Sequence, residues 1–490
     1  MALAILIGGA LVVINGIDGN ASRVARDART ENVLNQAKQA LIAYASGRDI
    51  SPTQTAVGTL PCPDLDDDGA AETSCGNASG STSQSNRLGR LPWRTLGIAD
   101  LRDASGERLW YAVSSMYKTS TVNGFNPTTG LGTITVRDAA GTVFQDGTLS
   151  NPYTAGTGGA VAVIFAPGDA LVRQGGSTLQ DRSCSGGSCG SQGECTSSPA
   201  SLTAKCNPVN YLDVAMGEDN SNFVDNNVTR TANGNGFISG PVFSGNSVIL
   251  NDRIAVVGYE DIMPALQRRV AREVLKCLTS YAATYRNRYP WPAPTCRQAS
   301  SINSWSDHDS VLFGRVPDTG SGTFDTTVST SGSTMGDTFT GDCMFESLTG
   351  WWPNWKRHVF YAVADAHKPA ASAAGNGGPC SGDSNCLRIA DSSGNILASN
   401  KQVAVIVTGR ALNGVSPAQV RSGNNDGYAS NYIEGNNVTL EQMIVGTIPA
   451  ACNALSPAVV TTGCSPLSNC NRVTTGNRSP SFNDVVVYSP

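Results

Sequence analysis

The chain has 490 residues, enough for two or three domains that each bury a core of their own. Only 15% of the residues are charged and 53 are glycine, which is unusual for a cytoplasmic enzyme and typical of a neutral, loop-rich extracellular protein. The net charge of −5 gives no reason to expect nucleic acid or an anionic membrane surface as a partner.

The first element is an apolar segment from Met1 to Ile14, shorter than the ~20 residues that a bilayer-spanning helix normally needs. No basic stretch precedes it and no small-x-small cleavage site follows it, so we expect it to be retained. Residues 15–20 are rich in Gly and Asn, which predicts an interruption of the helix there. Helix-compatible sequence returns from Ala21 to Ala45.

The rest of the chain presents one order of landmarks twice. Each set has an amphipathic helix, a Pro/Cys loop, a Gly-Arg step, two apolar strands, and an Asn-Asp pair followed by a β-branched strand. The first set lies at 33–44, 61–64, 89–92, 109–113, 161–165 and 251–257. The second set lies at 270–285, 291–296, 313–317, 359–363, 403–407 and 483–488. This self-similarity indicates tandem duplication of a whole domain and not a solenoid of short repeats.

The strands Val161–Phe165 and Val403–Val407 are apolar on both faces, so we place each centrally, under a helix. Each unit is therefore expected to be α+β, with a helix packed on a mainly antiparallel sheet. We expect a hydrophobic helix over 1–29, a first head domain over 30–265 and a second, duplicated head domain over 266–490. The segment 119–160 is polar and Gly-rich, which predicts a surface loop.

Fourteen cysteines, mostly in Gly/Ser-rich loops, indicate a disulfide framework and an oxidising compartment. We predict three local pairs: Cys62–Cys75, Cys277–Cys296 and Cys380–Cys386. Two further bridges are expected within each of two groups of four, in which three pairings remain open: Cys184, Cys189, Cys195 and Cys206, and Cys343, Cys452, Cys464 and Cys470.

An acidic stretch after Cys62 has the pattern of the first half of a calcium loop. Carboxylates stand at positions 1, 3 and 5, and Gly69 at position 6 permits the sharp turn. The predicted ligands of a calcium ion are Asp64, Asp66, Asp68, Glu72 and the backbone carbonyl of Ala70. Position 12 is Cys75 in place of a bidentate glutamate, so a further ligand must come from elsewhere. The alternative is a solvated acidic turn.

The chain lacks the sequence motifs of the common enzyme classes. One G-x-S-x-G string, Gly186–Gly190, lies in a loop without the strand and helix that a nucleophile elbow requires. Two of the acids Asp213, Glu218 and Asp219 could act as an acid/base pair on a glycan. The alternative is that all three belong to a solvated loop. We expect no catalytic residues and no enzyme.

A retained apolar helix that continues into an amphipathic one and carries a disulfide-bonded α+β head resembles the type IV pilin and pseudopilin family. The residues that carry the resemblance are Met1–Ile14, Asn32–Ala45, Leu60–Asp64, Gly89–Trp93 and Glu107–Val113. The last three look like a less familiar branch of large bacterial prepilin-like proteins. The resemblance implies a long N-terminal hydrophobic helix followed by two tandem pilin-like head domains.

One position departs from the family pattern. The fifth mature residue is usually a glutamate, thought to neutralise the terminal amine of a neighbouring subunit, but here it is Ile5 and the first acid is Asp18. Three explanations remain open. Subunit registration rests on apolar packing alone, the chain starts partway along the family's helix, or the protein is a tip or minor subunit.

The resemblance implies a structural subunit of an extracellular type IV pilus-like filament, a fimbrium with a role in cell adhesion. Copies of the chain would pack through their N-terminal helices, where Ala4, Gly8 and Gly9 allow close approach. The apolar segment would lie in the inner membrane before assembly. The alternatives are a minor or tip subunit, or a membrane-anchored enzyme or glycan-binding protein. In the last case Trp351 and its neighbours would stack on sugars rather than plug the core.

Overall fold

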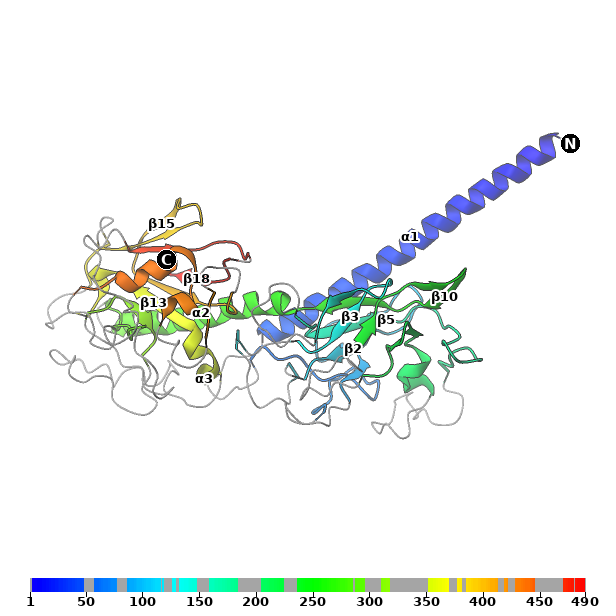
Figure 1. The fold of residues 1–490 in the computed structure, drawn as a ribbon, viewed down its shortest axis with the longest axis horizontal. Coiled ribbons are helices and arrows are strands. Elements are labelled where there is room, and N and C mark those ends of the chain that lie inside the picture. Colours follow the sequence, from blue (N-terminus) through cyan, green and yellow to red (C-terminus); the bar gives the residue numbers. More distant parts are fainter. Residues whose placement is uncertain are drawn as a thin grey trace.

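The structure is a computed structural model of the chain (Figure 1). It describes residues 2–47, 57–76, 86–115, 117–118, 126–128, 132–147, 158–183, 204–223, 236–284, 287–295, 310–317, 351–369, 377–380, 385–412, 418–421, 428–445, 470–479 and 481–489, with side chains of the first helix from Ala21 on.

The N-terminal helix α1 (Ala2–Gly47) is continuous. The predicted interruption at residues 15–20 is therefore wrong. Each glycine inside a helix costs only about 1 kcal/mol relative to alanine. A break would leave several backbone N–H and C=O groups without helical partners at each new end, so the continuous helix is retained.

The first half of the chain is built around an antiparallel sheet of four strands in the order β1-β2-β5-β11. Its strands are β1 (Leu88–Arg90), β2 (Trp110–Val113), β5 (Ala162–Ala166) and β11 (Arg253–Val257). The predicted central strand is β5, which lies between β2 and β11 and is buried along its whole length. Helix α1 contacts β5 and β11.

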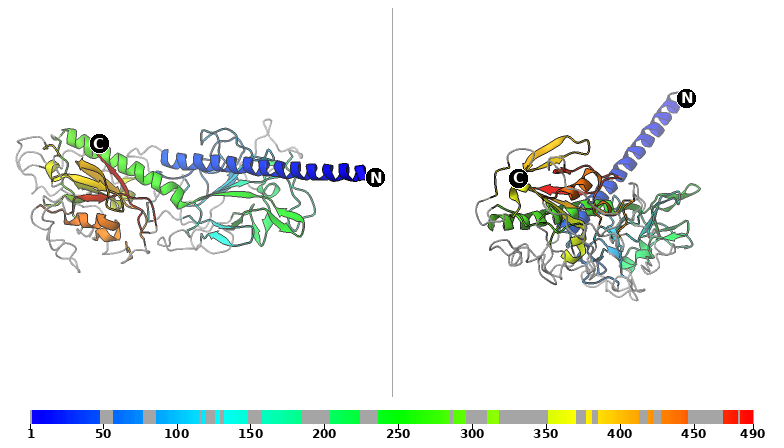
Figure 2. Two further views of the ribbon diagram at one scale, coloured as in Figure 1. Left: turned by 90° about the horizontal axis from the view of Figure 1, so that it is seen from above. Right: turned by 60° about the vertical axis from the view of Figure 1, so that its left-hand side comes forward.

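The second half contains an antiparallel sheet with the equivalent strand order, β12-β13-β16-β18. Its strands are β12 (Phe313–Arg315), β13 (Val359–Val363), β16 (Val403–Val407) and β18 (Val485–Tyr488). Helix α2 (Tyr259–Thr284) packs on β16 and β18, as α1 does on the first sheet. In both halves, a long helix thus lies on a sheet of four strands with the equivalent order (Figure 2).

The remaining strands form small sheets, two of which contain a parallel pair. The first is β4-β3-β8, with β3 (Thr135–Arg137), β4 (Val143–Gln145) and β8 (Gly236–Ile238). The second is β15-β14-β17, with β14 (Leu387–Ala390), β15 (Ile396–Lys401) and β17 (Arg472–Thr474). Two hairpins complete the set: β6 (Val214–Ala215) with β7 (Glu218–Asp219), and β9 (Val242–Ser244) with β10 (Ser247–Leu250).

Short helices connect these strands. They are α3 (Trp352–Trp355) and the 3-10 helices η2 (Ala204–Cys206), η3 (Pro208–Asn210), η7 (Lys356–His358), η8 (Asp365–His367), η10 (Ala429–Asn431) and η11 (Gly435–Gln442).

The predicted fold class is wrong. Instead of two pilin-like heads, each a helix on one mainly antiparallel sheet, the described strands form six small sheets in a mixed α/β arrangement with parallel pairings. The strands β3 and β4 lie within 119–160, which was predicted to be a surface loop. Strands of three residues carry too little periodicity to be recognised.

In the described part of the chain, no helix combines the length and apolarity needed to cross a membrane.

One hydrophobic cluster runs through both halves. It joins Leu41 of α1 and Tyr111 of the first sheet to Ile262 of α2, Val405 of the second sheet and Trp355. Trp351 and Trp352 belong to the same cluster and are buried, so these tryptophans plug the core and do not offer a sugar-binding face.

Two of the predicted disulfides are confirmed, Cys62–Cys75 and Cys380–Cys386. Cys206 and Cys470 are also disulfide-bonded. Cys277 lies on α2, and its predicted partner Cys296 is outside the described residues. The other cysteines for which bridges were predicted lie outside the described residues too: Cys184, Cys189, Cys195, Cys343, Cys452 and Cys464.

A buried carboxyl pair fastens the closing strand of the first half. Oδ2 of Asp252, just before β11, accepts the backbone N–H of Asp213 and the side-chain amide of Asn220, both at 2.8 Å. Oδ2 of Asp213 in turn accepts the backbone N–H of Asn251 at 3.0 Å, and its Oδ1 accepts the amide of Gln180 at 3.0 Å. Both carboxyl groups are fully buried.

The second half repeats this pair with a glutamate in place of Asp213. Oδ2 of Asp484, just before β18, accepts the backbone N–H of Glu434 and the side-chain amide of Asn437. Glu434 accepts the backbone N–H of Asn483 and the amide of Gln419. Oδ1 is buried without a hydrogen-bond partner in both Asp252 and Asp484.

Burial, reinforced by the charge of the other carboxylate, raises the pKa of Asp252 and of Asp484 well above the usual value. Burial also raises the pKa of Asp213, to about 6, although hydrogen bonds and Arg182 oppose the shift. Since the pKa is raised most strongly at Asp252 and at Asp484, we assign the proton of each carboxyl pair to these two residues.

These pairs predict the pH dependence of stability. A carboxyl whose pKa is raised on folding contributes stability at low pH, and the contribution is lost as the pH rises through the folded pKa. The contribution of these pairs to the melting temperature should therefore fall from about pH 4, near the ordinary pKa of aspartate, toward alkaline pH. Asp252→Asn with Asp484→Asn should flatten this fall, because an amide imitates the protonated carboxyl without titrating.

The matched control is Asp138→Asn with Asp391→Asn. These residues occupy equivalent hairpin turns and accept backbone N–H groups there. Calorimetry should show that the control keeps the fall of the wild type. An equal fall in the Asp252/Asp484 double variant would contradict the assignment.

Candidate functional site

The acidic loop predicted to hold calcium is anchored at both ends. The Cys62–Cys75 disulfide closes it, and the backbone of Asp64 exchanges two hydrogen bonds with Arg90 of β1, at 3.0 and 2.7 Å. Asp64 is only 1% exposed. The first carboxylate of the predicted site is therefore fixed on a sheet edge, and the rest of the loop turns around it.

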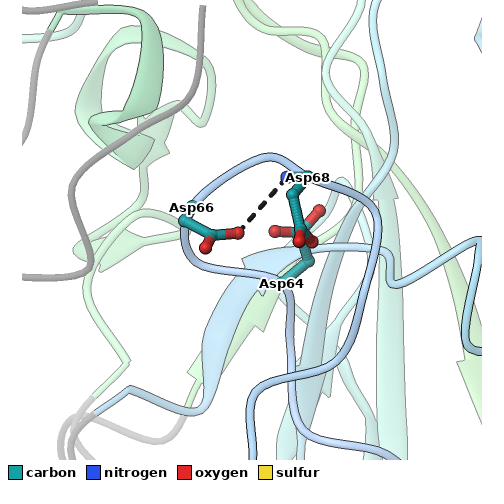
Figure 3. Close-up of side chains that lie close together, drawn as sticks. All are labelled: Asp64, Asp66 and Asp68. Atoms are coloured by element: carbon teal, nitrogen blue, oxygen red, sulfur yellow. Dashed lines mark hydrogen bonds between the residues drawn. The ribbon is translucent and has the colours of Figure 1, made fainter. Parts of the chain in front are cut away.

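Backbone N–H groups of the loop donate to the loop's own carboxylates, as Figure 3 shows for Asp68 and Asp66. Asp64 accepts the N–H of Asp67 at 2.7 Å and that of Gly69 at 2.8 Å. Asp66 Oδ1 accepts the N–H of Asp68 at 3.3 Å, and Asp68 Oδ1 accepts the N–H of Ala70 at 2.6 Å. Gly69 has φ +88°, a left-handed conformation that glycine adopts without strain.

Three of the five predicted ligands come together. One carboxylate oxygen from each of Asp64, Asp66 and Asp68 lies within 4.8 Å of the others. Glu72 is not part of this group, and its carboxylate accepts the N–H of Leu65 at 3.4 Å. Ala70 is engaged through its N–H with Asp68.

The crowding of carboxylates changes their acidity. Burial, together with the charges of Asp67 and Asp66, raises the pKa of Asp64 to about 7, although two backbone N–H groups oppose the shift. Burial raises the pKa of Glu72 as well, with help from the charge of Asp66. The loop thus carries negative charge in a place where part of it is poorly solvated.

Asp67, in the middle of the loop, was not predicted to have a role. It has φ +66° and forms ion pairs with Arg108 at 2.7 Å, Lys205 at 3.1 Å and Arg90 at 3.9 Å. Burial alone would raise the pKa of Asp67, but these cations lower it below the usual value. Arg108 and Lys205 are distant in sequence, so no local pattern pointed to this role.

The three acids considered as a glycan-directed acid/base pair do not face one another. Asp213 is buried against Asp252, Glu218 pairs with Arg137 at 2.9 Å, and Asp219 pairs with Arg173. Their positions fit structural roles in the first half of the chain.

A cleft of about 480 Å³ lies beside α1. Two ion pairs cross it, Arg26–Asp169 at 3.0 Å and Arg253–Asp27 at 3.1 Å. These four charges are therefore paired with one another across the cleft, and the pairs help to orient α1 on the first half.

Comparison of the chain with protein-family models, with curated proteins and with solved structures finds no match.

The loop geometry predicts a large effect of Gly69→Ala. A Cβ at this position would lie 2.5 Å from the indole of Trp93, in a backbone conformation that also strains alanine. Gly106→Ala is the matched control, because Gly106 has φ +84° but no atom near its Cβ position. Denaturant unfolding should show a loss of about 1–2 kcal/mol for the control. We expect a further loss of about 1–3 kcal/mol for Gly69→Ala from overpacking. Equal losses would show that the loop yields around Trp93.

Proposed function

We propose that this chain is a structural, non-enzymatic subunit of an extracellular type IV pilus-like filament, assembled by packing of the N-terminal helices of identical copies. The observation that carries the proposal is the overhang of α1. Residues 21–29 are exposed throughout, and Thr30 is the first buried residue of the described side chains. Figures 1 and 2 show the N-terminal part of α1 extending beyond the rest of the molecule.

Comparison with α2 shows that the overhang is peculiar to α1. Helix α2 buries Ile262, Met263 and Leu266 from its first turns. Helix α1 reaches the equivalent state only at Leu34, after 32 helical residues. At 1.5 Å per residue, the part before Arg23, the first residue of α1 that lines the cleft with the first half, is about 30 Å long. Folding of the heads does not require a helix of this length, which favours a role in contact with other molecules.

The sequence of the overhang supports self-association. Met1 to Ile14 is apolar, and large aliphatic side chains gain roughly 1.5–3 kcal/mol each on burial. Ala4, Gly8 and Gly9 would let neighbouring helices approach closely. Copies of the same helix satisfy both requirements. Before assembly, the inner membrane would cover the segment.

Helix α1 is also joined to both halves of the molecule. Besides Arg26–Asp169 and Arg253–Asp27, Lys38 pairs with Asp261 of α2 at 2.9 Å. Exposed pairs of this kind contribute about 0–1 kcal/mol each, so they orient the helix more than they stabilise it. The buried face of Leu34, Ala37 and Leu41 provides the main attachment.

Microscopy tests the filament proposal. Negative staining of sheared surface material should show filaments labelled along their length by antibodies to this chain. Gly8→Leu should abolish them by preventing close helix approach. Val172→Lys, on an exposed site of the first half, is the control and should leave them intact. Labelling only at filament ends would identify a tip subunit, and recovery of the wild type only as a detergent-soluble monomer would refute the proposal.

We propose, second, that the acidic loop binds calcium. The specific observation is that Asp64, Asp66 and Asp68 converge while backbone N–H groups hold the loop in its turn. Calcium takes six to eight oxygen ligands, so water or other groups would complete the three carboxylates. The ion would offset the repulsion that contributes to the raised pKa of Asp64.

Calorimetric titration tests this second proposal. Extracellular calcium sites bind at about 10⁻⁴–10⁻³ M. Binding should weaken as the pH falls below about 7, because Asp64 must release its proton. Saturating calcium should raise the melting temperature of the wild type and of Asp138→Ala, but not of Asp66→Ala. If calcium shifts none of the three, the loop is an acidic turn.

A further inference from the structure

The two halves of the molecule present the same hairpin. The pairs Val136↔Gln145 in β3–β4 and Ile389↔Ala398 in β14–β15 are equivalent. The turns are equivalent as well, since Asp138 and Asp391 each accept two backbone N–H groups of the turn that follows them.

The outer strand of each hairpin is an edge. In the described part of the chain, the strands β4 and β15 are each paired along one side only. An edge strand offers unpaired N–H and C=O groups to another strand. Figure 1 places β15 and β3, the inner neighbour of β4, in separate halves of the molecule.

Each edge carries a bulky apolar pair at the equivalent position. Val143 is 38% and Phe144 44% exposed on β4, and Ile396 is 42% and Leu397 58% exposed on β15. These four belong to the eleven large hydrophobic side chains that are exposed in the described part of the chain. Isolated apolar side chains on a surface are ordinary, but the same pair on the same edge of two duplicated hairpins favours a contact surface.

The two edges differ in charge. Around β4, the acids Asp138 and Asp146 outnumber Arg137, whose charge is paired with Glu218 of β7. Around β15, the cations Arg388, Lys401 and Arg472 outnumber Asp391. Arg388 and Arg472 are direct neighbours in the parallel pair of β14 and β17, which concentrates positive charge on this sheet.

We propose that the β15 edge of one copy pairs with the β4 edge of a second copy of this chain. The opposite charges favour this heterologous contact over pairing of like edges, because β15 with β15 or β4 with β4 would bring like charges together. A heterologous contact that does not close generates an open chain of copies. The contact uses surfaces of the two halves and not α1, so it is independent of the helix packing proposed above.

Site-directed cross-linking of the full chain tests the contact. One sample carries Phe144→Cys, a second carries Leu397→Cys, and a short thiol-reactive cross-linker is applied to each and to their mixture. Cross-linked dimer should form in the mixture and not in either sample alone. Val172→Cys mixed with Leu397→Cys is the matched control, because Val172 is 50% exposed but lies on neither edge.

Charge reversal adds a second test. Arg472→Glu in the Leu397→Cys chain should lose the cross-link, and Asp146→Lys in the Phe144→Cys chain should restore it. Cross-linking of Leu397→Cys with itself, or a mixed yield no higher than that of the Val172 control, would overturn the proposal. Repeating the mixture with Gly8→Leu in both chains separates this contact from α1 packing. If the cross-link persists in these chains while filaments are lost, the edge contact is supported and α1 packing is shown to be a separate requirement for filaments.

Discussion

The arrangement of each half depends on a carboxyl pair that receives backbone N–H groups where the closing strand begins. In the first half, Asp213 holds the N–H of Asn251 and Asp252 holds the N–H of Asp213. The loop before β6 and the start of β11 are thereby fixed to each other. Glu434 and Asp484 fix the same two places in the second half. Short strands in a Gly-rich chain provide little stabilisation of their own, so these polar clusters specify how the strands meet.

The same pairs show how far the duplication extends beyond the outer landmarks. Arg182 and Arg421 each donate to a glutamine and to the carbonyls around a tyrosine, and each lies over that tyrosine ring. Each network satisfies its buried polar atoms almost completely, with Oδ1 of Asp252 and of Asp484 as the exceptions. Such a network therefore changes less readily than the surface loops around it. Among the described residues of the second half, Ala293 stands in the place of Asp64 and lies against Gly314.

The sequence predicted structure correctly where a run of apolar residues was continuous or where two cysteines lay close together in the chain. The strands around Val163 and Val405 are central as expected, and the local disulfides Cys62–Cys75 and Cys380–Cys386 form. The helix continues across residues 15–20, contrary to the prediction. The prediction considered only the Gly and Asn residues there and left out the free energy that two new helix ends would cost.

Sequence reasoning was weaker for contacts between distant segments. At the candidate site, the alternation of acids pointed to Asp64, Asp66 and Asp68, which lie together, whereas Glu72 lies outside this group. Asp67 was passed over because its partners Arg108 and Lys205 lie in other segments. The parallel pairing of β3 with β8 joins segments about 100 residues apart and leaves no local signal.

The hydrophobic cluster shared by the two halves has a mechanical consequence. A force that pulls on α1 would act on the cluster that packs Leu41 with the first sheet. Through the same cluster and the Lys38–Asp261 pair, the force would also reach α2 and the second sheet. Neither half could be peeled away without exposing apolar surface of the other. Tension applied at the N-terminus would therefore be distributed over the whole cluster. The two halves would resist extension together and would not unfold independently.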